Sequence, residues 1–159
     1  MNKKNGANGF DDELSNELSS VIQAGIRILA YAPNTEKQLR VKLKRKGHNP
    51  DLIDSAIDYF IERGYLNDAD YIERVAENLA NKKLYGIVRV KNELYHMGFS
   101  YELIQQLNFD DIDFERNCAK MLRKRGGEFD EKTIAALKRY GYNGGDIKAA
   151  YKIIKQEDL

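Results

Sequence analysis

The chain contains one cysteine, two prolines and no tryptophan among its 159 residues. A single cysteine excludes an internal disulfide framework and any zinc site built from cysteines. Because proline is so scarce, long helices are permitted almost throughout. No apolar run approaches about 18 residues, and no signal-peptide pattern is present, so we expect a soluble, cytoplasmic protein without membrane association.

Sequence patterns typical of catalysis are also missing. There is no Gly-rich phosphate loop, no nucleophile elbow and no metal-ligand spacing. The two histidines, His48 and His96, lie far apart without a suitably spaced acid, and Cys118 has no basic partner, which favours a core thiol. We therefore expect no enzyme, no metal and no cofactor. A helical nuclease built on scattered carboxylates is the catalytic alternative that the sequence leaves open.

The chain does contain an internal repeat. Residues 71–107 match residues 114–150 at a constant shift of 43, and a weaker copy lies upstream at a shift of 51. A fixed period of this size indicates stacked supersecondary units, which typically present extended binding surfaces rather than enclosed pockets. The matching pairs include Val75 with Cys118, Leu79 with Leu122, Gly98 with Gly141, and, upstream, Leu43 with Leu94 and Gly47 with Gly98.

Apolar residues recur at helical spacing throughout, and no stretch alternates with period two. We count nine helices and predict an all-α fold of three tandem three-helix repeats in an elongated array, with its curvature left open. The predicted repeats cover residues 21–66, 67–108 and 109–159. Residues 1–20 would form an N-terminal tail and the start of the first helix, with residues 1–12 disordered.

Start and stop signals support this helix count. Thr35 and Gln38 have the spacing of a capping box, and Asn49-Pro50 has the residues of an N-cap and first turn. Four glycines, each followed by His or an aromatic residue, are typical of the Schellman stop, in which a left-handed glycine ends the helix. These glycines are Gly47, Gly64, Gly98 and Gly141.

The net charge is only +1, but the two signs are segregated along the chain. Three basic stretches recur in the three predicted repeats, whereas residues 51–73 are strongly acidic, so the small sum conceals strong local fields. Lys37, Arg40 and Lys44 share one helix face. Because the acidic residues lie mostly on the adjacent helix, we expect the positive charges of this face to remain uncompensated. A solvated helix face is the simpler interpretation of any single stretch. The candidate partner-binding residues are Lys37, Arg40, Lys44, Arg45, Lys82, Lys83, Arg89, Lys91, Arg123, Lys124 and Arg125.

Tyrosines mark the predicted junctions between repeats. Tyr85 lies beside Lys82 and Lys83, where it could stack on a base or pack between helices, and packing is the interpretation we favour. Tyr65 and Leu66 are expected to be buried at the junction between the first two repeats.

Three segments of the chain resemble the RecX family of bacterial RecA regulators. The run from Ala24 to Tyr31, followed by Thr35 to Gly47, is similar to the opening of that family. The segment Phe60-Ile-Glu-Arg-Gly-Tyr-Leu-Asn-Asp-Ala-Asp-Tyr resembles its signature between repeats one and two. Leu84-Tyr85-Gly86 and the helix after it resemble its second repeat, and the similarity continues more loosely to about residue 154.

The resemblance implies three tandem three-helix repeats that bind the RecA recombinase filament along its helical groove and inhibit or disassemble it. Such a regulator would modulate recombination and DNA repair, would act as a monomer and could also bind single- or double-stranded DNA. Two alternatives stay open, because three-helix units can read DNA directly and helical solenoids are also general protein-binding scaffolds.

Overall fold

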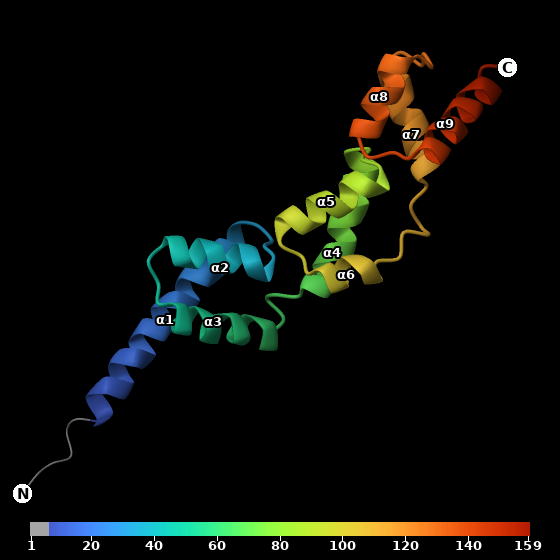
Figure 1. Ribbon diagram of the computed structural model, residues 1–159. Helices are drawn as coiled ribbons and strands as arrows, with labels where there is room; N and C mark the ends of the chain where they lie inside the picture. Colours follow the sequence, from blue (N-terminus) through green and yellow to red (C-terminus); the bar gives the residue numbers. More distant parts are fainter. Residues whose placement is uncertain (1–6) are drawn as a thin grey trace, which may run out of the picture. The chain divides into compact units, whose positions relative to one another are not determined.

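The computed structural model describes residues 7–159, with side chains from Glu13 onward, and this part of the chain is helical without any strand (Figure 1). The predicted all-α class is therefore confirmed. Of the predicted disordered segment, residues 1–6 lie outside the described part, but α1 already begins at Ala7, so the prediction is wrong for residues 7–12. The chain divides into two compact units, Met1–Asp68 and Ala69–Leu159.

The described residues form nine α-helices and one π-helical turn, η1. Their bounds are α1 (Ala7–Tyr31), α2 (Glu36–Arg45), α3 (Pro50–Glu62), α4 (Asp68–Glu77), η1 (Asn78–Lys82), α5 (Ile87–Met97), α6 (Tyr101–Gln106), α7 (Phe114–Lys124), α8 (Glu131–Arg139) and α9 (Gly144–Glu157).

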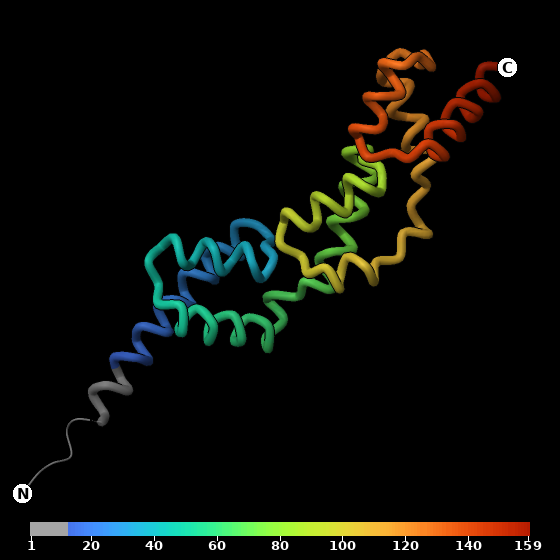
Figure 2. Tube along the Cα trace, viewed as in Figure 1, coloured from blue at the N-terminus to red at the C-terminus, as the bar shows by residue number. Residues whose placement is uncertain are grey.

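The first unit is a three-helix core in which α3 packs against α1 and α2, as the trace in Figure 2 shows. Phe60 is its largest fully buried side chain and belongs to the same apolar cluster as Val21, Leu39 and Leu43. Gly25 lets α1 approach this ring, because a Cβ at that position would overlap the Phe60 side chain. The glycine inside the first helix therefore serves close packing.

The segment after α3 closes the first unit. Leu66 is buried in its core, as expected, but Tyr65 is 62% exposed, so the predicted burial of Tyr65 is wrong. The Asp68 carboxylate accepts a hydrogen bond of 3.1 Å from the backbone N–H of Glu36, at the start of α2. Partial burial raises the pKa of Asp68, although this hydrogen bond opposes the shift.

The predicted caps are present. Thr35 and Gln38 form a reciprocal capping box, and Asn49 accepts a hydrogen bond from the N–H of Asp51 before α3. The predicted glycine stops adopt positive φ and carry the 6→1 backbone bond of the Schellman motif, and Gly126 and Gly127 add a fifth such stop. The bonds run from His48 to Leu43, Tyr65 to Phe60, Phe99 to Leu94, Tyr142 to Leu137 and Gly127 to Leu122.

The second unit contains two apolar clusters. One lies among α4, η1, α5 and α6 and includes the fully buried Val90 and Leu94. The other lies among α7, α8 and α9 and includes the fully buried Leu122 and Leu137. Most members of the two clusters come from the second and third predicted repeats respectively, but Leu84 of the second belongs to the α7–α9 cluster. The division of the chain into three repeats remains a prediction.

A direct backbone contact joins the two clusters of the second unit. The N–H of Gly86 donates to the carbonyl of Tyr140 at 2.8 Å, and the N–H of Val88 donates to the carbonyl of Gly141 at 3.3 Å. The carbonyls of the two residues that follow α8 thus satisfy N–H groups at the start of α5, where a helix has no internal acceptors. A Cβ at Gly86 would overlap the Gly141 backbone, so only glycine allows this approach.

The segment before Gly86 also packs on the α7–α9 cluster. Leu84 has φ of 56°, a left-handed conformation that is rare for a leucine, yet its side chain is buried in the α7–α9 cluster. The hydroxyl of Tyr142 donates to the Leu84 carbonyl at 2.7 Å, and burial raises the pKa of that hydroxyl. Asn117 of α7 donates to the carbonyl of Ala80 in η1, which supplies a partner where the π-helical turn alters the backbone ladder.

We predict that Gly141→Ala destabilises the second unit more than Gly126→Ala. Both glycines have similar φ, 93° and 102°, so both variants meet the left-handed penalty of about 1–2 kcal/mol. A Cβ at Gly141 would also collide with Arg89, whereas one at Gly126 meets open space. Because of this collision, Gly141→Ala should lower the free energy of unfolding by about 1–3 kcal/mol more than Gly126→Ala does. Urea denaturation of both variants measures the difference. Equal losses for the two variants would contradict the tight contact.

Candidate functional site

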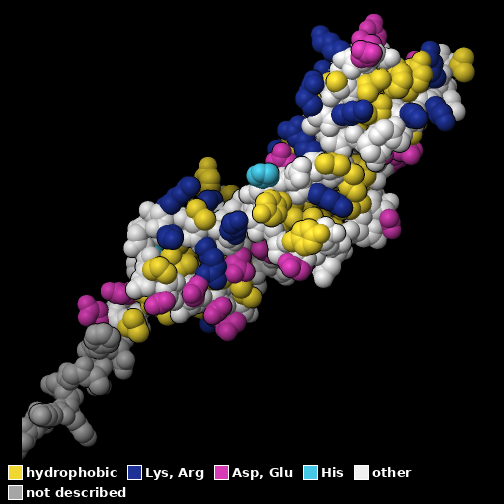
Figure 3. All heavy atoms as spheres, in the orientation of Figure 1, with side chains coloured by type: hydrophobic (Ala, Val, Ile, Leu, Met, Phe, Trp, Pro, Cys, Tyr) yellow, Lys and Arg dark blue, Asp and Glu magenta, His cyan; other side chains and the backbone are white. Residues whose placement is uncertain are grey.

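The basic face predicted on α2 is present but partly compensated. Lys37 and Lys44 are exposed on α2, as is Arg45. Arg40 instead pairs with Glu36 on its own helix and with Asp54 of α3, so the expectation that these charges stay uncompensated is wrong for Arg40. Partial burial would lower the pKa of Arg40, but its hydrogen bonds to the two carboxylates raise it. Figure 3 shows dark-blue side chains over α2 and magenta side chains over α3.

The second basic stretch is spread over η1 and the first turns of α5. Arg89 is half-buried, with its guanidinium 3.9 Å from the ring centre of Tyr85 and 5.4 Å from that of Tyr140. It also pairs with Glu93 at 3.4 Å. Tyr85 thus packs between helices, the interpretation favoured from the sequence, and Arg89 is held against it.

The remaining members of this stretch differ in accessibility. Lys82 and Lys83 are exposed at the end of η1, and the Lys83 ammonium lies 6.0 Å from the Tyr85 ring centre. Lys91 is half-buried, with its ammonium 5.7 Å from the ring centre of Phe109. Lys83 and Lys91 therefore lie near aromatic rings, at distances where the attraction is modest.

The third basic stretch ends α7. Arg123 pairs with Glu157 of α9, while Lys124 and Arg125 are exposed. Among the described residues, no ion pair or aromatic contact involves the following predicted site residues, which are the most available for a partner: Lys37, Lys44, Arg45, Lys82, Lys124 and Arg125.

The structure adds a feature of the first unit that the sequence did not single out, which we name the α1–α2 groove. It has a volume of about 320 Å³ and is lined by Ala24, Arg27, Ile28, Tyr31, Lys42 and Lys46. None of its charged or aromatic members, Arg27, Tyr31, Lys42 and Lys46, was among the predicted site residues. Arg27 and Tyr31 are four residues apart on α1, and the same spacing separates Lys42 of α2 from Lys46, the residue that caps α2. This shared spacing on neighbouring helices is the signal that could have indicated the groove.

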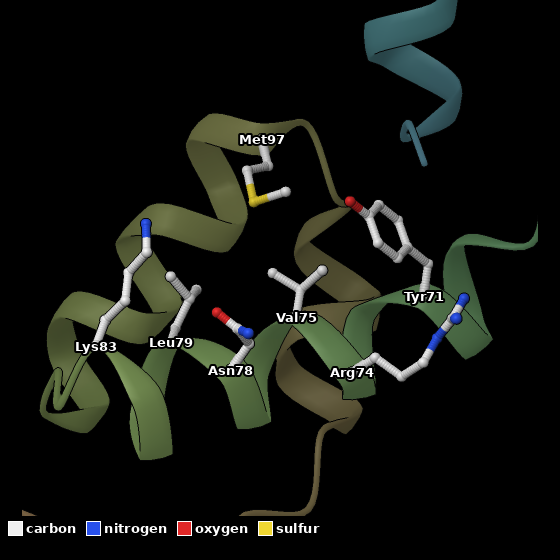
Figure 4. A pocket seen from close by; sticks show the side chains of 7 residues that line it. All are labelled: Tyr71, Arg74, Val75, Asn78, Leu79, Lys83 and Met97. Carbon is white, nitrogen blue, oxygen red and sulfur yellow. The ribbon is translucent and has the colours of Figure 1, made fainter. Parts of the chain in front are cut away.

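A second groove, the α4–α5 groove, lies within the second unit (Figure 4). It has a volume of about 310 Å³, with side chains of α4 and η1 on one side and Met97 of α5 on the other. Val75 and Leu79 contribute apolar surface, whereas Arg74 and Lys83 bring positive charge to it. Its aromatic member, Tyr71, packs on the buried side chain of Phe99, and the centres of the two rings are 5.5 Å apart.

The described residues offer little for chemistry. They include no group of three or more histidine, cysteine, aspartate or glutamate side chains placed to hold a metal ion. Cys118 is fully buried, as expected for a core thiol, and burial raises its pKa to about 12, which suppresses the reactive thiolate. Within the same part of the chain, no helix combines the length and apolarity required to cross a membrane.

The amino-acid sequence and the fold were compared with known proteins, and the matches described here all carry the name RecX. The family model described as "RecX, first three-helix domain" matches residues 22–60. A Regulatory protein RecX from Vibrio cholerae serotype O1 (strain ATCC 39541) is 33% identical over 81 residues, which cover 51% of this chain and 53% of that relative. The match therefore spans about half of the relative's length. A Regulatory protein RecX from Xanthomonas axonopodis pv. citri is 28% identical over 137 residues, covering 81% of this chain and 84% of the relative.

Two solved structures share the fold. The crystal structure of RecX from Lactobacillus salivarius superimposes with a TM-score of 0.77 at 19% identity, over 89% of this chain and 99% of that one. A crystal structure of regulatory protein RecX gives a TM-score of 0.75 at 14% identity, over 98% and 79% of the two chains. At these identities the likeness shows the fold, while the sequence relatives indicate the family.

We predict that Arg89→Ala lowers the unfolding free energy by about 1–2 kcal/mol, because it removes a half-buried cation that lies near the rings of Tyr85 and Tyr140. Lys82→Ala, at an exposed position of the same basic stretch, should change it by no more than about 0.5 kcal/mol. Urea denaturation of both variants tests the difference. If Arg89→Ala were as stable as the unchanged chain, Arg89 would return to the set of residues available for a partner.

Proposed function

Because this chain belongs to the RecX family of regulatory proteins, we propose that it binds the RecA recombinase filament and inhibits or disassembles it, thereby modulating recombination and DNA repair. The observation that carries the proposal is the match of the chain to regulatory proteins named RecX over most of its length, on a shared helical fold. The resemblance of the junction segments to that family supplies RecA as the partner.

The surface chemistry supports a charged protein or nucleoprotein partner. Lysines and arginines are exposed at the ends of α2, η1 and α7, and they can pair with acidic protein surface or with phosphate oxygens. The described residues lack an enclosed site with metal ligands or a reactive thiol, which fits a regulator that acts by binding.

The proposal predicts inhibition of RecA by direct mixing. Added to filaments preformed on single-stranded DNA, the purified chain should reduce the DNA-dependent ATPase of RecA at concentrations below those that retard naked DNA in a gel. The physical reason is that the filament offers protein contacts in addition to phosphates. Tight retardation of naked DNA with an unaffected filament would reject the proposal in favour of a DNA-binding protein.

A charge reversal on α2 locates the contact. We expect Lys37→Glu combined with Lys44→Glu to raise the concentration needed for half-inhibition about tenfold, because attraction becomes repulsion on an exposed face. The melting temperature should hardly change, since surface substitutions typically alter stability by only about 0.5 kcal/mol.

Lys132→Glu combined with Arg139→Glu is the matched control. These residues are exposed on α8 with the same spacing of seven positions and belong to none of the predicted basic faces. Inhibition by this control variant should be unchanged. Equal weakening by both double variants would mean that net charge, rather than the α2 face, determines binding.

A further inference from the structure

The α1–α2 groove has a composition unlike that of an ordinary packing defect. Arg27, Lys42 and Lys46 supply three positive charges to its lining, and no carboxylate is among the lining residues. Ala24 and Ile28 supply half-buried apolar surface from α1. The groove therefore combines a positive field with apolar contact area.

Tyr31 is the unusual member of this lining. Its side chain is 93% exposed at the C-terminal end of α1, and no ring or cation within the described residues stacks on it. An aromatic ring left in water contributes nothing to the core of the unit. Beside three cations, such a ring is suited to stack on the face of a base.

One of the three cations, Lys42, is also held in place by a hydrogen bond. Lys42 donates to the side-chain oxygen of Asn34, a residue only 5% exposed, whose own amide donates to the carbonyl of Ala32 at 2.7 Å. Lys46 follows Lys42 by one helical turn, about 6 Å along the axis, so two lysines can reach successive phosphates of an extended strand. Less side-chain entropy is lost on binding when a cation is already held in place.

The corresponding helix positions of the second unit show that this pair of charges is particular to the first unit. At the shift of 51 seen in the sequence, Ala24 and Ile28 correspond to Val75 and Leu79, which line the α4–α5 groove. Arg27 and Lys46 likewise correspond to Asn78 and Met97 in that lining. The same helix positions thus form a groove in both places, but cations occupy these two positions only in the first unit.

We propose that the α1–α2 groove binds a segment of single-stranded nucleic acid, with Arg27, Lys42 and Lys46 on its phosphates and Tyr31 stacked on a base. An acidic protein segment would satisfy the charges but would gain little from an exposed aromatic ring, so the ring favours a nucleic acid. This inference stands apart from the proposed action on the RecA filament, because it rests on the groove alone.

The test uses the full chain and a fluorescein-labelled oligothymidylate of about fifteen nucleotides, with binding followed by fluorescence anisotropy at several salt concentrations. Arg27→Gln combined with Lys46→Gln should weaken binding about tenfold and reduce the slope of log K against log salt by about 1.4, because each phosphate that is no longer neutralised accounts for about 0.7. Lys148→Gln combined with Lys152→Gln, on α9, removes two exposed lysines and should leave the slope unchanged.

Tyr31 provides the second arm. Tyr31→Ala should weaken binding at least about fivefold without changing the salt slope, because base stacking does not depend on counterion release. Tyr31→Phe should retain the affinity, since the ring face is preserved. Because the side chain is so exposed, neither variant should alter the melting temperature.

Three results would overturn the proposal: no binding of the oligonucleotide by the unchanged chain, an unchanged affinity in the Arg27→Gln, Lys46→Gln variant, or an unchanged affinity in Tyr31→Ala. Displacement of the oligonucleotide by polyglutamate, together with a silent Tyr31→Ala, would assign the groove to acidic protein segments instead. The groove variants should still inhibit preformed RecA filaments if the proposed function holds, so failure of either idea is distinguishable from failure of the other.

Discussion

The second unit depends on one contact between two glycine backbones. Gly86 and Gly141 meet without side chains between them, so the carbonyls of Tyr140 and Gly141, just after α8, accept hydrogen bonds from N–H groups at the start of α5. N–H groups at the start of α5 that would otherwise need water or side-chain caps are thereby satisfied by backbone carbonyls. Leu84 then reaches the α7–α9 cluster despite its left-handed backbone, because burial and the Tyr142 hydrogen bond offset the strain.

The sequence predicted the helices well because their determinants are local. Apolar spacing, the Thr35 capping box and the glycine stops each act within a few residues of the chain, so the pattern alone indicates them. The Gly86–Gly141 contact could not be predicted in this way. It joins residues 55 positions apart, and nothing local distinguishes a glycine that ends a helix from one that also touches another backbone.

The candidate site was harder to predict for a related reason. The basic runs were visible in the sequence, but whether a cation is compensated depends on which carboxylates and rings the fold brings to it. Arg40 and Arg123 acquire ion-pair partners from other helices, and Arg89 lies near the ring of Tyr140. Lys37 and Lys44 do not acquire an ion pair among the described residues. Arg27 and Tyr31 were missed because their meaning comes from Lys42 and Lys46 on the neighbouring helix.

The pair of matching grooves has an evolutionary consequence. A duplicated helical module carries every copy of its concavities with it, whether or not each copy has a ligand. Substitutions at a few helix positions can then give one copy a new specificity without any change in the backbone. Examples are the positions where one groove has an arginine or lysine and the other has an asparagine or methionine. A new binding specificity would in that case arise by substitution of side chains on an existing groove rather than by formation of a new groove.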